Sequence, residues 1–311
     1  MARTREKCRG KACLAPTHGR AGWRWRVQLI SLVIFNSYFL SPVGKYLCLP
    51  VLNCYSCPVG AVACPVGSVI AFAAVRRIPY YVLGFLGLMA VSAGRAFCGW
   101  ACPFGYLQDW LYRIRSPKWK LPRAADGLKY AMLVVLVVAL PLALGRGEAQ
   151  TASERIVQGS KGSFDYCAVV CPAGTMEAAL PKLASDKEFR AHIPLRTWSK
   201  LAILGAVLGL GVVSRRSFCR SLCPLGAITA LTSGMSLLRL RTDPDKCTRC
   251  MRCAQVCPTD GRSVPAAAGD KESSAECVLC LDCVRSCPHG GALSARFGDR
   301  PILTSQGARD A

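Results

Sequence analysis

The chain has 311 residues, of which 52% are hydrophobic and 20 are cysteines, and its formal net charge at pH 7 is +22. Such a charge is typical of nucleic-acid-binding proteins, but here the basic residues concentrate beside long apolar stretches, as membrane-topology signals do. Cysteines separated by two or three residues have the spacing of metal ligands, which argues against a disulfide-stapled secreted domain. The composition therefore predicts a membrane protein that binds metal and has no nucleic-acid partner.

Four apolar stretches are long enough to cross a bilayer as helices, which takes about 17–25 residues each. They are Val27–Leu47, Ile78–Gly94, Leu128–Gly145 and Trp198–Ser214. Buried helices of a large soluble core are the alternative, but the four stretches contain almost no charged residues. We therefore expect a mainly α-helical, integral membrane bundle of about four transmembrane helices in contact with membrane lipid.

The distribution of basic residues predicts the orientation of these spans. The segment Met1–Arg26 contains eight basic residues and one acidic residue, and Arg95–Gly127 is also basic, whereas Arg146–Arg196 is nearly balanced. Basic loops stay on the cytoplasmic side. We therefore expect a multi-pass protein of the bacterial cytoplasmic (inner) membrane with both termini in the cytoplasm.

Two shorter segments and a change of composition complete the expected organisation. Val66–Val75 is too short to span and is expected to be re-entrant or interfacial, and Ala227–Leu240 is expected to form an interfacial amphipathic helix. Beyond Arg241 the sequence becomes polar. The predicted domains are a basic cytoplasmic segment (1–26), a membrane domain (27–240), a two-cluster ferredoxin domain (241–293) and a tail (294–311).

The polar C-terminal region contains two cysteine runs, CTRCMRCAQVCP from Cys247 and CVLCLDCVRSCP from Cys277. Both have the C-x2-C-x2-C-x3-C-P spacing of bacterial two-cluster ferredoxins, in which the fourth cysteine binds the other cluster. Zinc also accepts four cysteines, but the duplicated run with its terminal proline favours iron–sulfur clusters. The predicted [4Fe–4S] ligands are Cys247, Cys250, Cys253 and Cys287 for one cluster, and Cys277, Cys280, Cys283 and Cys257 for the other.

The second half of that run, Cys-x3-Cys-Pro, also occurs alone after two of the predicted spans. Each pair supplies two thiolates, and a cluster needs four. We therefore expect one inner-face metal centre formed by Cys98, Cys102, Cys219 and Cys223. Redox-active dithiols are the alternative. Trp100, Gln108 and Asp109 lie beside the inner motif, although a solvated helix face explains Gln108 and Asp109 equally well.

Related Cys-Pro motifs lie in the segments expected outside the membrane. They offer five candidate ligands for an outer-face centre, Cys54, Cys57, Cys64, Cys167 and Cys171. Disulfides or dithiols are the alternative at this side. Several Cys-Pro pairs are followed by x-Gly, and proline suits the start of a helix while glycine allows close approach of a bulky group.

The motifs FCGWACP (97–103) and FCRSLCP (218–224), together with the two ferredoxin runs, resemble the NapH-type membrane subunits of quinol dehydrogenases in periplasmic nitrate reduction. They are also similar to the polyferredoxin-like membrane portion of NosR-type proteins. The resemblance implies four membrane helices, cytoplasmic C-terminal clusters and electron flow from quinol towards a periplasmic reductase system. The outer cysteine motifs depart from that pattern.

We therefore expect a membrane-bound iron–sulfur protein that relays single electrons between the quinone pool, or a cytoplasmic donor, and a redox partner. The expected cofactors are two [4Fe–4S] clusters, one or two further iron–sulfur centres and a quinone. The expected partners are quinol and other redox proteins, either ferredoxin-like or periplasmic reductase subunits, so that the chain is a candidate component of a quinol dehydrogenase. A ferredoxin-like factor that reduces copper during enzyme maturation and a thiol–disulfide relay are the alternatives.

Overall fold

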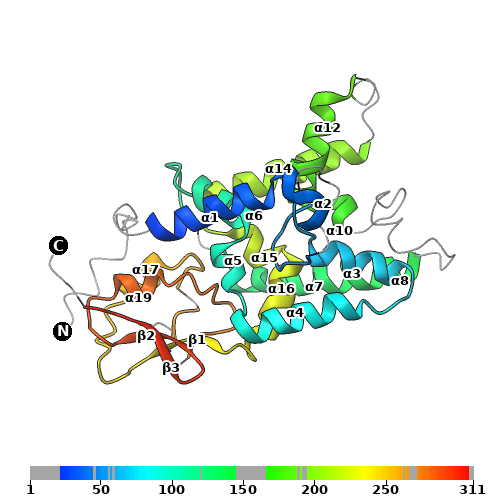
Figure 1. The fold of residues 1–311 in the computed structure, drawn as a ribbon. Helices are drawn as coiled ribbons and strands as arrows, with labels where there is room; N and C mark the ends of the chain where they lie inside the picture. Colours follow the sequence, from blue (N-terminus) through cyan, green and yellow to red (C-terminus); the bar gives the residue numbers. More distant parts are fainter. Residues whose placement is uncertain are drawn as a thin grey trace.

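The structure, a computed structural model, describes residues 22–44, 47–54, 57, 60–119, 121–144, 166–187, 190, 195–261, 263–265 and 272–307. These residues form a mainly helical part and a C-terminal part that carries a three-stranded sheet. Figure 1 shows the helices packed side by side, with α17, α19 and the strands gathered at one end of the helical part. Most of the predicted basic segment 1–26 lies outside the described residues.

The first two predicted spans are only partly helical. Val27–Leu47 contains α1 (Gly22–Phe35), the 3-10 turn η2 (Tyr38–Leu40) and the short α2 (Ser41–Gly44). The α1 helix ends where the side-chain amide of Asn36 donates to the Leu32 carbonyl at 2.9 Å. Ile78–Gly94 contains α4 (Tyr80–Ala93), which begins after Pro79 and ends at Gly94, whose φ of +53° favours glycine.

The other two predicted spans are helical along almost their whole length. The first of them runs through η3 (Arg123–Gly127), α7 (Leu128–Met132), the π-helical η4 (Leu133–Ala139) and α8 (Leu140–Leu144), and the second is α14 (Leu195–Val213). In the described part of the chain, only Ala124–Leu144 is both long and apolar enough to cross a membrane, with a mean hydropathy of 2.2 and 17% burial. The helix lengths thus do not confirm four spans.

The two shorter apolar segments both pack inside the helical part. Val66–Val75 corresponds to α3 (Pro65–Ala74), which contacts α4, α8 and η4. The expectation of an interfacial amphipathic helix at Ala227–Leu240 is wrong. Instead, α16 (Pro224–Ser233) packs against α4 and α7 with Leu225, Ala227 and Ala230 buried, and its chain then enters a strand.

The C-terminal part is built on an antiparallel sheet of order β1-β2-β3. Its strands are β1 (Leu238–Thr242), β2 (Leu293–Phe297) and β3 (Arg300–Thr304), and Ala295 of β2 lies opposite Leu240 on one side and Leu303 on the other. The helices α17 (Arg252–Val256) and α19 (Asp282–Ser286) pack against each other. The sheet therefore begins three residues before the predicted domain boundary and includes much of the predicted tail.

A large hydrophobic core lies in the helical part, and it contains cysteines from four of the Cys-Pro motifs there. Phe104 and Phe218 do not occupy equivalent positions in the two repeats. Their rings nevertheless meet edge to face, with the centroids 4.9 Å apart. The same core includes Tyr166, Val137 and Val207. Cysteines of this core are Cys64, Cys102, Cys167, Cys171, Cys219 and Cys223.

Candidate metal centres

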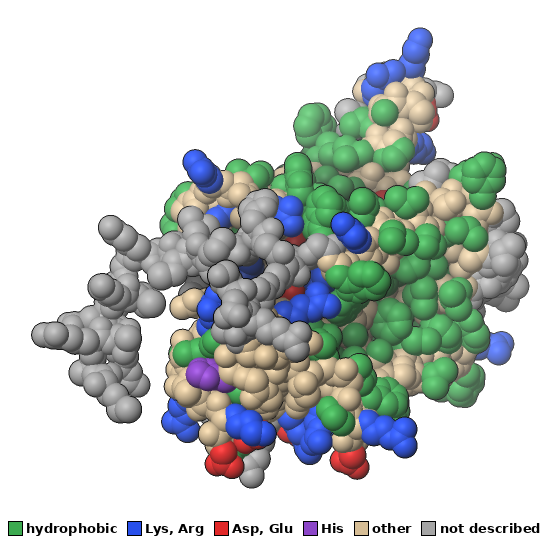
Figure 2. Space-filling view, turned by 60° about the vertical axis from the view of Figure 1, so that its left-hand side comes forward, with side chains coloured by type: hydrophobic (Ala, Val, Ile, Leu, Met, Phe, Trp, Pro, Cys, Tyr) green, Lys and Arg blue, Asp and Glu red, His purple; other side chains and the backbone are tan. Residues whose placement is uncertain are grey.

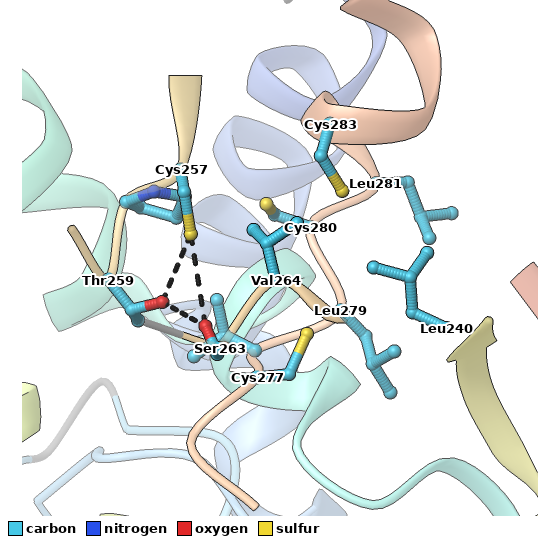
Figure 3. Close-up of a pocket in the computed structure, with 12 residues that line it drawn as sticks. Leu240, Cys257, Thr259, Ser263, Val264, Cys277, Leu279, Cys280, Leu281 and Cys283 are labelled. Carbon is cyan, nitrogen blue, oxygen red and sulfur yellow. Dashed lines mark hydrogen bonds between the residues drawn. The ribbon is translucent and has the colours of Figure 1, made fainter. Parts of the chain in front are cut away.

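The C-terminal part contains two pockets, and each is lined by four cysteines. One pocket has an empty volume of about 350 Å³, and the other, drawn in Figure 3, of about 330 Å³. The cysteines of the first pocket are Cys247, Cys250, Cys253 and Cys287, and those of the second are Cys257, Cys277, Cys280 and Cys283. The structure thus brings together both predicted sets, including the exchange of the fourth cysteine between the two runs.

The two cysteine loops have the same unusual backbone. Arg249 and Met251 in the first loop, and Leu279 and Leu281 in the second, have φ values of 53°, 62°, 48° and 62°. A left-handed conformation is unfavourable for residues with a Cβ and persists only where the surrounding structure holds it. It turns backbone N–H groups towards the sulfurs, as that of Leu279 does towards Cys277.

Burial controls the ionisation of these thiols. Loss of solvent raises the pKa of Cys253 and of Cys277 to about 11 each. At neutral pH such thiols stay protonated unless a cation stabilises the thiolate, so ligand formation is tied to metal binding. Beside them, Cys257 lies 3.1 Å from the Thr259 hydroxyl and 3.8 Å from that of Ser263, and both hydroxyls can donate to a thiolate (Figure 3).

The four cysteines expected at the inner face also come together, from four helices. Cys98 lies in α5 (Ala96–Trp100) and Cys102 precedes α6 (Pro103–Leu111), while Cys219 lies in α15 (Ser217–Ser221) and Cys223 precedes α16. Each thiol is within electrostatic range of the others. These four residues are called the inner group below.

Local sequence explains how the Cys-Pro motifs present their sulfurs. Cys64, Cys102, Cys171 and Cys223 each precede a helix that begins at proline, which lacks the N–H that would be unpaired there. The N–H of the glycine three residues on points back at the sulfur, with N–S distances of 3.4 Å at both Cys171 and Cys223. Helix N-termini favour negative charge, so these donors offset part of the cost of burying a thiolate.

The two repeats support each other's cysteines. Gln108 and Thr229 both lie six residues after the second cysteine of their repeat. The Gln108 amide donates to the Cys219 sulfur at 3.0 Å, while the Thr229 hydroxyl lies 3.9 Å from the Cys98 sulfur. Gln108 is only 1% exposed, so its interpretation as part of a solvated helix face is wrong. Sequence reasoning missed this pair, although the equal offset from each motif was visible.

Two buried arginines occupy equivalent positions, three residues before the first cysteine of each repeat. Arg95 and Arg216 are 2% and 1% exposed. Arg216 pairs with Asp109 at 2.7 Å and donates to the Cys98 carbonyl at 2.9 Å, so Asp109 is not on a solvated face either. Arg95 pairs with Glu276 of the C-terminal part at 2.7 Å. Both guanidinium groups interact electrostatically with thiols of the inner group.

The C-terminal part docks directly on the inner motif. A Cβ at Gly99 would overlap the Val278 carbonyl oxygen and lie 3.6 Å from the Cys280 backbone nitrogen. The Trp100 indole donates to the Leu279 carbonyl at 2.9 Å. Residue 99 thus touches the loop that carries the second ferredoxin-type cysteine set, and the inner group lies beside that set.

Charged side chains surround this contact. Arg24 bridges Asp109 at 3.3 Å and Asp282 at 3.2 Å. Glu276 binds Lys129, a fully buried residue of the helical part, at 2.5 Å as well as Arg95. Arg215 donates to the carbonyls of Val256 and Cys257 at 3.1 and 3.3 Å, and Arg220 pairs with both Asp126 and Asp260.

Three of the cysteines expected at the outer face lie in the same hydrophobic core as three cysteines of the inner group, Cys102, Cys219 and Cys223. The N–H of Leu52, two residues before Cys54, points at the Cys102 sulfur. Cys64, Cys167 and Cys171 belong to that core, and Cys57 is buried beside Cys54. The motif pattern could not reveal that the chain after α2 folds back into the bundle.

No three His, Cys, Asp or Glu side chains within the described ranges are arranged to hold a single metal ion. The eight cysteines of the C-terminal part instead line two pockets whose walls include the apolar residues Leu240, Val264 and Leu293. Both pockets have four soft thiol ligands and backbone donors turned inward. These features fit a polynuclear [4Fe–4S] cluster.

Comparison with known families supports this fit. A family described as "4Fe-4S binding domain" matches the chain twice, at residues 81–122 and 197–242. Each match contains one Cys-x3-Cys-Pro motif, which supports the tandem repeat. A second family with the same description matches residues 240–262 in the C-terminal part. The chain therefore carries 4Fe-4S binding domains, and [4Fe–4S] clusters are its cofactors.

Several curated proteins are similar to the chain. The "Regulatory protein NosR" of Pseudomonas aeruginosa is 29% identical over 52% of this chain and 20% of its own length. The "Ferredoxin-type protein NapH" of Haemophilus influenzae is 25% identical over 54% and 49%, and the "Putative electron transport protein YccM" of Escherichia coli is 24% identical over 76% and 60%.

The chain spans only part of its relatives. The matched regions cover 54% and 61% of the first two curated relatives. No solved structure matches the chain. The relatives therefore establish the ferredoxin-type character of the chain, as the sequence motifs predict.

Proposed function

We propose that this chain, a relative of the NapH- and NosR-like ferredoxin-type proteins, relays single electrons between a quinone pool, or a cytoplasmic donor, and a redox partner such as a periplasmic reductase system. Bound [4Fe–4S] clusters supply one-electron redox chemistry. The chain's own residues bind the clusters, keep water away from them and fix their order in space.

The proposed ligands follow the thiol groups described above. Cys247, Cys250, Cys253 and Cys287 bind one [4Fe–4S] cluster, Cys257, Cys277, Cys280 and Cys283 bind a second, and the inner group, Cys98, Cys102, Cys219 and Cys223, binds a third centre. The exchange of Cys257 and Cys287 between pockets keeps the first two clusters adjacent. Apolar residues such as Leu279 and Val284 exclude water between them.

The observation that carries this proposal is the contact between Gly99 and the loop of Val278 to Cys280. Through it, three groups of thiols follow one another without an intervening layer of solvent or lipid. The hydrogen bond from Trp100 to Leu279 and the ion pairs of Glu276 hold the two parts in register. A molecule that only stored or delivered a metal would have no need for such a succession.

A location in the membrane with four spans is part of the proposal. Figure 2 shows hydrophobic side chains spread over the helical part, whereas Lys and Arg gather on the C-terminal part. Exposed apolar residues occur on each proposed span, among them Ile30, Leu83, Val134 and Leu210. A contiguous apolar surface of this kind suits lipid. The 14-residue α1 and α4 are shorter than about 20 residues, so adjoining segments would complete those two spans.

The orientation proposed from the basic segments agrees with the docking geometry. Three basic side chains of the helical part form ion pairs with the C-terminal part, namely Arg24, Arg95 and Lys129. The basic ends of the helices and the ferredoxin part therefore lie on one side. The positive-inside tendency assigns that side to the cytoplasm. Both termini are then cytoplasmic.

Reduction by quinol of the anaerobically purified chain in lipid nanodiscs tests the proposal. We expect a soluble quinol analogue to generate the EPR signal of a reduced [4Fe–4S] cluster, with one electron taken up per reduced centre and the quinol oxidised to quinone. Dithionite serves as the control that all centres can be reduced. The quinone link is wrong if dithionite reduces the centres, whereas quinol reduces none and quinone reoxidises none.

A further inference from the structure

Four thiols outside the inner group converge in the core of the helical part. An ideal Cβ at Gly174 would lie 3.8 Å from the sulfurs of both Cys54 and Cys171, so that glycine leaves room between them. An ideal Cβ at Gly67 would lie 4.0 Å from the Cys167 sulfur. The N–H of Gly67 points at the Cys64 sulfur. Cys64 and Cys54 each interact electrostatically with Cys171.

Main-chain hydrogen bonds position the fifth cysteine of this region, Cys57. Its N–H donates to the Cys54 carbonyl at 3.1 Å, and its carbonyl accepts from the Gly60 N–H at 3.2 Å. The Cys54 N–H in turn donates to the Glu177 carboxylate at 2.5 Å, which holds Cys54 against η5 (Thr175–Ala179).

A buried hydroxyl is close both to thiols of this set and to the inner group. Tyr166 is fully buried, and its hydroxyl has no hydrogen-bond partner among the described residues. It interacts electrostatically with Cys171, Cys167 and Cys64, and also with Cys223 of the inner group. A buried donor without an acceptor destabilises the folded state. An acceptor that the side chains do not provide, such as the sulfur of a metal cluster, would remove that destabilisation.

We propose that Cys54, Cys64, Cys167 and Cys171 bind a fourth iron–sulfur centre beside the inner group, and that the Tyr166 hydroxyl donates a hydrogen bond to it. The role of this centre in an electron relay rests on the proposed function. Its binding to the four cysteines can be tested independently of that function. Tyr166 is a positioning residue here, because it acts through a hydrogen bond and not as a ligand.

The position of this centre changes the expected path. The Leu52 N–H donates towards Cys102 only two residues before Cys54, and three cysteines of each thiol set belong to one hydrophobic core. The bilayer core is about 30 Å thick, and a carrier-free gap of that size would interrupt a relay. With the fourth centre inside the bundle, the succession of thiol groups continues from the ferredoxin part into the membrane part.

Iron and acid-labile sulfide per chain, measured on the anaerobically purified full-length protein, test the fourth centre. We expect about 16 iron atoms in the unaltered chain, at four per cluster, and about 12 in Cys54→Ala and in Cys171→Ala. Cys57→Ala and Cys48→Ala are the matched controls, since both remove a buried cysteine outside the proposed set, and each should keep about 16. The EPR signals of the ferredoxin part report whether each variant is folded.

Three outcomes would overturn the inference: about 12 iron atoms in the unaltered chain, unchanged iron in folded Cys54→Ala and Cys171→Ala, or a Cys54–Cys171 disulfide in anaerobic protein by mass spectrometry. Failure of quinol to reduce the protein, with the iron counts as expected, would refute the proposed function but not the centre. Tyr166→Phe should keep about 16 iron atoms and lower the reduced-to-oxidised ratio of one centre about tenfold at a fixed applied potential. An unchanged ratio would remove the role of Tyr166.

Discussion

The Gln108 side chain of the first repeat holds Cys219 of the second, donating to its sulfur at 3.0 Å while accepting the Phe218 N–H at 3.2 Å. The reciprocal contact, Thr229 to Cys98, is longer at 3.9 Å. The two repeats are therefore related in sequence, but the hydrogen bond that each offers to a cysteine of the other repeat differs in strength. This inequality is measurable.

Replacing Gln108 by leucine should make the inner centre harder to reduce. A hydrogen bond to a thiolate stabilises the more negative, reduced state, and its loss should cost about 1–2 kcal/mol, or roughly tenfold in the reduced-to-oxidised ratio. An EPR-monitored redox titration measures the shift. Thr229→Val is the matched control and should shift the ratio less, because its contact is longer. Equal shifts in the two variants would contradict this prediction.

Replacing Gly99 by alanine should loosen the ferredoxin part from the helical part. The added methyl group would overlap the Val278 carbonyl, and overpacking of this kind costs about 1–3 kcal/mol. We expect faster hydrogen exchange at Trp100 and Leu279 and slower equilibration of electrons between the two parts. Gly84→Ala is the control, since a Cβ there meets open space. Unaltered exchange at the contact would show that the glycine is not required.

Replacing Glu276 by glutamine should destabilise the protein. The change leaves Arg95 and Lys129 buried without a compensating charge, which typically costs about 3–5 kcal/mol. Thermal unfolding followed by the loss of cluster absorbance measures the effect. Glu272→Gln provides the control, because Glu272 pairs with Arg239 and Arg241 at a largely exposed site, where about 0–1 kcal/mol is expected. Similar melting temperatures for both variants would contradict the buried-network interpretation.

Cys257 and Cys287 each line the pocket formed mainly by the cysteine run to which they do not belong. Replacing either by alanine should therefore remove the cluster of that pocket. In Cys257→Ala we expect loss of the signal from the pocket of Cys277, Cys280 and Cys283, and in Cys287→Ala loss of the signal from the other pocket. The two EPR signals can be assigned with Thr259→Val. Thr259 lies beside Cys257, so this variant should shift only the potential of the cluster bound by Cys257, Cys277, Cys280 and Cys283. Loss of the same signal in both variants would exclude the exchanged ligand sets.

The sequence was sufficient where residue spacing alone determines the chemistry. The C-x2-C-x2-C-x3-C-P runs imply which cysteines share a pocket, since short loops can wrap only one group, and the structure gathers the same residues. The halves of the inner group could be paired because a two-thiolate motif is incomplete. The Cys-Pro step also indicated helix starts, as seen at Cys102 and Cys223.

Long-range contacts were beyond the reach of spacing and periodicity. Leu238–Leu240 was expected to end an interfacial amphipathic helix, yet the strand Leu238–Thr242 pairs with β2, which lies some fifty residues further along the chain. For Gln108 and Asp109, polarity alone could not distinguish a solvated helix face from burial against a partner such as Cys219 or Arg216. The location of Tyr166 close to thiols of both sets depends on the folding back of a loop, for which no local pattern exists.

The crossed support of the inner group has a further consequence. Gly226 faces the guanidinium of Arg95, Gly105 faces that of Arg216, and each motif's sulfur is approached by a side chain of the opposite repeat. A half-length chain with one repeat could complete such an arrangement only by pairing with a second copy of itself. Joining the two copies in one polypeptide fixes their stoichiometry and frees them to diverge, as the difference between Gln108 and Thr229 at equivalent positions illustrates.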